Sequence, residues 1–478
     1  MTNALPFPCE PSSSRSVRSE CQPHKRGILI ATIAGSSLAF IVGSIINVAL
    51  PAMQDEFAAG ATGAQWIVNA YLLPLGALVL MGGAIGDHVG RKRVFLAGLV
   101  IFTAACLVCA LAWSFPVLIL GRALEGVGAA MIAPTSLAII ADGFSGAERG
   151  RAVGTWAAVG AAAGAVAPLA GGIIVDVAGW RWTFVAVMPI AVLAWAVARH
   201  SVRESVAAVE DRAPLDWLGA GLISAGLLAL IWSLVALPER GATGSVLMAA
   251  AAGVMLVAVF LLVEHRKGNA AMTPLTLFGS RSFSGLSLLT FFLYMALGGL
   301  LVLLPYVLIR ELDYGATQAG AAILPFPLIL GLLSRTVGGS LAGLIGTRRI
   351  LALGSVAVAC GFFLFTRVPA GDVSYWRHIL PGLVVLALGM AASVAPLTSA
   401  VLASAGDRYT GVASGINNAI SRIGGLVATA LLGVVLIGSA DKLADGFSAA
   451  AWAGVALAGA SALSAWLLVD PKAVGSAD

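Results

Sequence analysis

The chain has 478 residues, of which 59% are hydrophobic and only 11% are charged. Soluble globular domains carry charged side chains at about 25% of positions, so this composition excludes an ordinary water-soluble protein and indicates a chain that lies in lipid. The formal net charge of +5 is distributed over short polar segments between apolar runs, and we therefore expect no nucleic-acid partner.

The first 26 residues are polar, so we expect residues 1–26 to form a cytoplasmic tail that is disordered by composition. The apolar run that follows, from residue 27 to about residue 50, is longer than the h-region of a secretory signal and long enough to span a bilayer. We therefore expect no removal of an N-terminal segment. Residues 471–478 are predicted to form a second cytoplasmic tail.

Apolar runs of spanning length recur along the whole chain. A helix needs about 20 apolar residues to cross the hydrocarbon core, and fourteen runs approach or exceed this length. They lie near residues 27–50, 64–86, 94–112, 116–141, 152–175, 181–199, 215–237, 245–264, 284–309, 318–345, 349–368, 379–404, 411–438 and 448–469. The predicted fold class is an all-α membrane protein with about 14 transmembrane helices.

The connecting segments differ in charge. If the N-terminus is cytoplasmic, the segments on that side hold nineteen Lys and Arg residues and those on the opposite side hold six. Cytoplasmic loops of membrane proteins are enriched in Lys and Arg, so we predict that both termini are cytoplasmic and that the number of helices is even. The three remaining basic residues, Arg122, Arg335 and Arg422, lie inside apolar runs.

Several classes of chemistry find no support in the sequence. There is no G-x-x-x-x-G-K-[ST] segment, which excludes a P-loop for ATP on this chain. Cys106 and Cys109 form a C-x-x-C inside an apolar run and are interpreted as packing residues. No histidine lies deep in an apolar run and no catalytic constellation occurs, so we expect no metal, no cofactor and no enzyme activity.

One polar loop occurs twice. The segment GGAIGDHVGRKRVFLAG (82–98) matches GGSLAGLIGTRRILALG (338–354) at many positions, as in a duplicated transporter. The basic cluster of the first copy has a simple interpretation as positive-inside topology. The alternative is a conformational switch in which Asp87 meets an arginine or a helix N-terminus in one state only. Its candidate residues are Gly83, Asp87, Gly90, Arg91, Lys92 and Arg93.

Several motifs in order make the chain resemble the major facilitator superfamily, and within it the fourteen-helix drug:proton antiporter branch. The motifs are INVALPAMQ (46–54), GAIGDHVGRKR (83–93), LGRALEGVGAAMIAPTSLA (120–138), GAVAPLAGG (164–172) and GVASGINNAISRIGGLVATALLG (411–433). The resemblance implies six-helix bundles over residues 27–199 and 284–470, with two extra helices and cytoplasmic linkers over residues 200–283. It also implies alternating access around a central cavity.

The function that the resemblance implies is export of a drug, an antibiotic or a metabolite, driven by the proton gradient across the bacterial inner membrane. We expect a monomer whose partners are a small-molecule substrate, protons and the lipid bilayer. In the antiporter-like helix, the residues that match the family signature are Gly164, Pro168, Gly171 and Gly172. The alternative function is uptake or facilitated transport of a small polar or anionic solute without proton antiport.

Arg122 and Glu125 are the candidates for proton coupling. They lie three positions apart in a spanning run, on one face of a helix, so that they can pair. Members of the resembling branch commonly carry an aspartate in their first helix, where this chain has Val42, and a glutamine where it has Glu125. Glu125 is therefore interpreted either as a permanent counter-ion of Arg122 or as the carboxylate that replaces the missing acid as proton carrier.

Other polar side chains in the apolar runs are candidates for lining a substrate cavity, and hydrogen bonding between helices is the alternative for them. An arginine that faces the cavity unpaired would favour an anionic or polar substrate over a lipophilic cation. The candidates are Asn47, Gln65, Asn69, Tyr71, Arg335, Asn417, Asn418 and Arg422.

Overall fold

The computed structural model describes residues 22–206, 215–268, 271, 273–334, 340–369, 373–406, 409–438 and 443–470. Every regular element in these ranges is helical. The first six helices are α1 (Gln22–Glu56), α2 (Ala61–Val89), α3 (Arg91–Ala110), α4 (Phe115–Gly143), α5 (Gly146–Ala178) and α6 (Arg181–Ser201). Helix α1 begins within the segment that was expected to be a tail.

Two further helices, α7 (Trp217–Arg240) and α8 (Gly244–Lys267), precede a short 3-10 helix at Leu275–Gly279. The remaining helices, together with a π-helical turn at Tyr375–Ile379, complete the described chain. They are α9 (Arg281–Arg310), α10 (Ala316–Ile323), α11 (Pro325–Leu333), α12 (Ser340–Ile345), α13 (Thr347–Phe365), α14 (Leu380–Ala405), α15 (Thr410–Gly438) and α16 (Leu443–Leu468).

Among the described residues, thirteen helical segments are long and apolar enough to cross a membrane. The predicted run at 411–438 corresponds to α15, which has 29 residues but is not among the thirteen. With α15 as a further crossing, the prediction of about 14 transmembrane helices is confirmed.

The predicted helix at 318–345 is not continuous. Helix α10 ends at Ile323 and α11 begins at Pro325, with Leu324 as a turn between them, while residues 335–339 lie outside the described ranges. Pro325 and Pro327 have no backbone N–H to donate to the preceding turn, which explains the interruption. The P-F-P sequence therefore divides this crossing into pieces.

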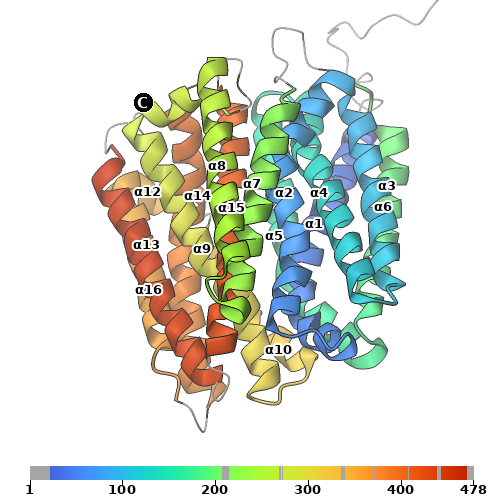
Figure 1. Cartoon of the computed structure of the whole chain (residues 1–478). Helices are drawn as coiled ribbons and strands as arrows, with labels where there is room; N and C mark the ends of the chain where they lie inside the picture. The colour runs from blue at the N-terminus through green and yellow to red at the C-terminus, as the bar shows by residue number, and fades with distance from the viewer. Residues whose placement is uncertain are drawn as a thin grey trace, which may run out of the picture.

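The helices form two groups that Figure 1 shows side by side, one coloured blue to cyan and the other yellow to red. We call α1–α6 the N-terminal bundle and α9–α16 the C-terminal bundle. Within them α3 packs on α4, α1 on α5, α13 on α14 and α9 on α16. The green helices α7 and α8 stand at the junction, where α7 contacts both α2 and α15.

The two ends of the molecule are named here by residues that lie at them. The Arg91 end holds the α2–α3 connection, the end of α4 and the start of α5. The Arg310 end holds the ends of α1, α5 and α9 and the start of α10. In Figure 1 the Arg310 end, with α10, is at the bottom.

Candidate functional site

At the Arg310 end, charged side chains join the two bundles. Arg310 at the end of α9 donates hydrogen bonds to the Asp55 carboxylate (2.5 Å) and to the Pro51 carbonyl (3.1 Å), both on α1. Asp176 near the end of α5 accepts hydrogen bonds from the backbone N–H groups of Ala316 (3.1 Å) and Thr317 (2.8 Å). The carboxylate therefore satisfies N–H groups of the first turn of α10 that have no partner within the helix.

Glycines allow the backbones of α5 and α10 to touch at this end. A Cβ atom on Gly172 would lie 2.3 Å from the Ala316 carbonyl oxygen, and one on Gly320 would lie 2.3 Å from the Pro168 carbonyl oxygen. These contacts leave no room for a side chain. Of the predicted antiporter-like residues, Pro168 and Gly172 thus face the other bundle.

The other two residues of this group face α1. A Cβ atom on Gly171 would lie 2.9 Å from the Ile45 side chain, and one on Gly164 would lie 3.3 Å from Cβ of Phe40. Helix α5 is therefore held against α1 by two glycines and against α10 by a third.

Toward the Arg91 end, the same helix has free space around it. A Cβ atom on Gly150 or Gly154 would meet no atom of the described chain within 4 Å. Several neighbouring residues of α5 are exposed, including Thr155 and Val159. Helix α5 thus touches the C-terminal bundle closely at the Arg310 end, whereas a Cβ atom on Gly150 or Gly154 nearer the Arg91 end would enter open space.

Among the described residues, the candidate switch residues at the Arg91 end contact their own bundle and the segment that follows it. Arg91 donates hydrogen bonds to Asp87 (2.8 and 3.0 Å) and to Asp142 at the end of α4 (2.5 Å). Lys92 donates to the Arg199 carbonyl through its amine (2.7 Å) and to the Glu204 carboxylate through its backbone N–H (3.1 Å). Asp87 thus pairs with an arginine, but this arginine is Arg91, four residues later at the start of α3.

The remaining candidates fit the same connection. Arg93 lies 3.6 Å from the Glu204 carboxylate. Gly90 has φ +124, and a Cβ atom there would lie 2.5 Å from Glu204, so only glycine fits this turn. Gly83 packs against the Pro134 ring, where a Cβ atom would be in ordinary contact at 3.4 Å. The loop therefore fastens α2, α3 and α4 to the segment after α6.

A long contact between α2 and α15 joins the two bundles on the side of α7. Gln65 donates a hydrogen bond to the Ala430 carbonyl (3.1 Å), and Asn69 accepts one from the Thr429 hydroxyl. Farther along, Gly76 lies against Arg422, and Gly415 lies against Leu80. Gln65 and Asn69 therefore make the interhelical hydrogen bonds that were the alternative to a cavity role.

Arg122 and Glu125 form an ion pair inside the N-terminal bundle, with side chains that are 1% and 0% exposed. Arg122 also donates a hydrogen bond to the Ile67 carbonyl (3.1 Å), and its guanidinium lies 4.6 Å from the centre of the Tyr71 ring. Glu125 accepts a hydrogen bond from the Cys106 thiol (3.2 Å). The pair is thus enclosed by α2, α3 and α4.

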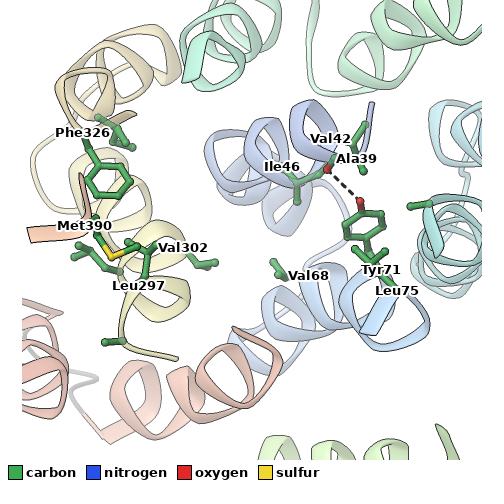
Figure 2. Packing of buried hydrophobic residues seen from close by; sticks show 14 of the residues in the cluster. Ala39, Val42, Ile46, Val68, Tyr71, Leu75, Leu297, Val302, Phe326 and Met390 are labelled. Carbon is green, nitrogen blue, oxygen red and sulfur yellow. Dashed lines mark hydrogen bonds between the residues drawn. The ribbon is translucent and has the colours of Figure 1, made fainter. Parts of the chain in front are cut away.

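Tyr71 extends this arrangement to α1. Its hydroxyl donates a hydrogen bond to the Ala39 carbonyl (3.1 Å), as Figure 2 shows, next to Val42 at the position of the missing acid. Tyr71 and Val42 are both buried in the apolar core. Across the view in Figure 2, Leu297, Val302 and Met390 come from the C-terminal bundle.

Three candidate side chains have no hydrogen bond or ion pair with other described residues: Asn47, Asn418 and Arg422, which are all half-buried. Asn417 instead accepts a hydrogen bond from Thr290 (2.7 Å) within the C-terminal bundle. Arg335 lies outside the described residues. Arg422 reaches from α15 toward α1, where its guanidinium lies 6.0 Å from the centre of the Phe40 ring.

Sequence reasoning missed the contacts at the Arg310 end. Nothing in the spacing of Asp55, Asp176 and Arg310 along the chain pairs them with the groups that they contact. The sequence pattern also indicates Cys106 only as a packing residue. The structure shows in addition that its thiol donates a hydrogen bond to Glu125. Within the described ranges there is no group of three or more His, Cys, Asp or Glu residues that would hold a metal ion.

Comparison with known proteins gives consistent matches along the chain. The profile of the Major Facilitator Superfamily matches residues 32–429. The puromycin resistance protein of Streptomyces alboniger is 31% identical over 461 residues, which cover 93% of this chain and 91% of that protein. The methylenomycin A resistance protein of Bacillus subtilis is 28% identical, covering 96% of this chain and 97% of that protein.

Solved structures with the same fold have low sequence identity. A D-xylose–proton symporter superposes with a TM-score of 0.67 at 16% identity, covering 94% of this chain and 99% of that one. A peptide transporter in complex with sulfate gives a TM-score of 0.68 at 15% identity, covering 91% and 93%. At this identity the likeness concerns the fold alone.

Proposed function

Because the chain belongs to the Major Facilitator Superfamily and is thus a multi-pass membrane transporter of small molecules, not an enzyme, we propose that it exports its substrate by alternating access. The observation that carries this proposal is the one-sided closure along α5. Backbone contacts at Gly172 and Gly320 close the Arg310 end, whereas Gly150 and Gly154 have free space around them. Such an interface belongs to a transporter that is open toward the Arg91 end.

We assign the Arg91 end to the cytoplasm, and with it both termini and the bacterial inner membrane as location. The support is charge, since Arg91, Lys92, Arg93, Arg348 and Arg349 all lie at this end and cytoplasmic loops are rich in such residues. The predicted division at residues 27–199, 200–283 and 284–470 is consistent with the packing of α1–α6 and α9–α16. The protomer is proposed to act as a monomer.

The proposed substrates are drugs or antibiotics. Support comes from the names of the relatives, which are resistance proteins for puromycin and methylenomycin A. Expression in a drug-sensitive bacterium lacking its own efflux pumps tests the proposal. We expect resistance to rise and intracellular accumulation of a drug to fall, with Gly172→Ala as the inactive control. Unchanged accumulation across a panel of cationic, neutral and anionic drugs would refute it.

For proton coupling, we propose Glu125 as the carboxylate that is protonated and released once per cycle. Every other carboxylate within the described helices lies in the first or last turn of its helix. Arg122 contacts the Ile67 carbonyl and the Tyr71 ring, both on α2, and α2 runs along α15 of the other bundle. Movement between the bundles would therefore change the surroundings of the pair.

The test uses everted membrane vesicles with equal amounts of folded protein. Glu125→Gln is expected to abolish proton release driven by substrate, whereas Glu125→Asp retains part of it. Coupling that persists in Glu125→Gln would leave Glu125 as a counter-ion only. The second candidate function, transport without proton antiport, is favoured by the enclosure of Glu125 and by Val42 in α1.

A further inference from the structure

Arg422 is a charged side chain in the middle of α15, at the surface where the two bundles meet. Its Cβ atom lies 3.3 Å from the position of a Cβ atom on Gly76 of α2, and its guanidinium lies 6.0 Å from the centre of the Phe40 ring on α1. Gly76 thus leaves the space through which the arginine stem passes. The side chain reaches from the C-terminal bundle to the N-terminal bundle.

Arg422 has no counter-ion among the described residues, whose ion pairs all involve other basic side chains. The mid-helix carboxylate, Glu125, is fully enclosed and already bound by Arg122 and Cys106. An arginine at this depth is costly unless it faces a water-filled cavity or acquires a partner, and such a residue marks a substrate or ion pathway by default.

The surroundings of Arg422 combine polar and aromatic groups. Asn418 precedes it by one helical turn and lies on the same face, and its side-chain amide has no hydrogen-bond partner in the described chain. Phe40 is 38% exposed, which is unusual for an aromatic side chain in the middle of a helix that packs inside a bundle.

We propose that Arg422 and Asn418 bind the carboxylate of an aromatic or otherwise apolar organic anion, whose apolar part packs on Phe40, and that such anions are the substrate class of the transporter. This inference rests on the proposed transport function and adds the charge of the substrate to it. A guanidinium presents its N–H donors in a planar fork that matches a carboxylate, while the Asn418 amide supplies another donor. A cationic drug would instead meet an uncompensated positive charge.

Under this proposal, such a molecule reaches Arg422 along the half of α5 nearer the Arg91 end. Gly160 and Gly164 of α5 both lie beside Phe40, with Cβ positions 3.4 and 3.3 Å from its side chain. Beyond them toward the Arg91 end, Gly154 has no described neighbour within 4 Å. Because the cytoplasm is electrically negative, the exit of an anion is driven by the membrane potential and does not need a proton-carrying carboxylate beside the substrate.

The experiment measures equilibrium binding to the purified full-length protein with three fluorescent probes of one ring system: dansylglycine (anion), dansylglycinamide (neutral) and dansylcadaverine (cation). We expect wild type to bind dansylglycine at least ten times more tightly than either other probe. Arg422→Gln is expected to reduce this preference to less than twofold, and Arg422→Lys to retain part of it. Asn418→Ala is expected to weaken dansylglycine binding about threefold.

Arg240→Gln is the matched control, because Arg240 is an exposed arginine at the end of α7 and its loss changes the net charge equally. It is expected to leave the preference unchanged. Equal or tighter binding of the cation by wild type, or no saturable binding of dansylglycine, would overturn the inference. Should Arg422→Gln fail to fold, the wild-type comparison still decides. If the protein exports drugs from cells but prefers cations, the anion site is overturned and the proposed export function stands.

Discussion

Arg122 and Glu125 form an ion pair one helical turn apart on α4, and neither side chain reaches solvent. The pair is satisfied on three sides, by the Ile67 carbonyl, the Tyr71 ring and the Cys106 thiol. Removing only one member of such a pair destabilises the fold, because the member that remains is a buried charge without compensation.

Glu125→Gln is therefore expected to lower the free energy of unfolding by about 3 kcal/mol, the lower end of the range for breaking a buried pair. Thermal unfolding of the protein in detergent measures this. The Arg122→Gln/Glu125→Gln double variant removes both charges and is expected to be more stable than Glu125→Gln alone. If the double variant is the less stable of the two, the pair does not act as a charge-neutralising unit.

Gly172→Ala is expected to prevent full closure of the Arg310 end, since its Cβ atom would lie 2.3 Å from the Ala316 carbonyl oxygen. The carbonyl oxygen belongs to the backbone and cannot turn aside as a flexible side chain could, so α5 and α10 must separate. Labelling of a cysteine placed near Thr317 by a membrane-impermeant reagent should increase, and transport should fall about tenfold or more. Gly150→Ala on the same helix is the control, because its Cβ atom would enter open space.

Asp176→Ala is expected to weaken the same closure by removing the acceptor of the Ala316 and Thr317 N–H groups. Loss of an N-terminal capping side chain costs about 1 kcal/mol, which corresponds to a shift of about fivefold in the population open at the Arg310 end. Electron-paramagnetic distance measurements across this end would detect it. Asp176→Asn keeps one acceptor oxygen for the two N–H groups, so it should lose less of the closure than Asp176→Ala; an equal effect of both substitutions would contradict the capping role.

Asp216 at the start of α7 predicts a pH dependence of stability. Burial raises the pKa of this carboxyl, but hydrogen bonds from Glu264, Lys267 and the Gly219 N–H outweigh it, so that the pKa lies below its usual range. A carboxyl with a lowered pKa in the folded state stabilises that state above its unfolded pKa, about 4 for Asp, and loses this contribution as the pH falls through the folded value.

Unfolding midpoints measured from pH 7 to pH 3 should therefore fall below about pH 4 in wild type. Asp216→Asn should start from a lower midpoint at pH 7 and show a weaker acid dependence, because it cannot form the 2.6 Å ion pair with Lys267. Parallel curves for the two proteins would show that Asp216 contributes nothing to this dependence.

Local spacing predicted part of this structure and not the rest. The pairing of Arg122 with Glu125 follows from their separation on one helix, and the spans follow from the length of the apolar runs. Cys106, Thr429 and Asp176 act on partners from other helices, as when Thr429 contacts Asn69 360 positions away. Such contacts depend on how the bundles dock, which one sequence does not specify.

The break between α10 and α11 was overlooked for a different reason. Pro325 and Pro327 mark it locally, but the hydropathy of the run is continuous across them. Apolarity therefore indicated a single crossing, while the hydrogen-bonding capacity of the backbone determined where the helix is interrupted.

The position of α7 beside both α2 and α15 makes the molecule mechanically asymmetric. On the side of α7, the two bundles are joined by the hydrogen bonds between α2 and α15 and by α7 itself, which contacts both helices. Along α5 the close backbone contacts between the bundles, at Gly172 and Gly320, lie at the Arg310 end. Opening and closing should thus be largest at the α5 edge.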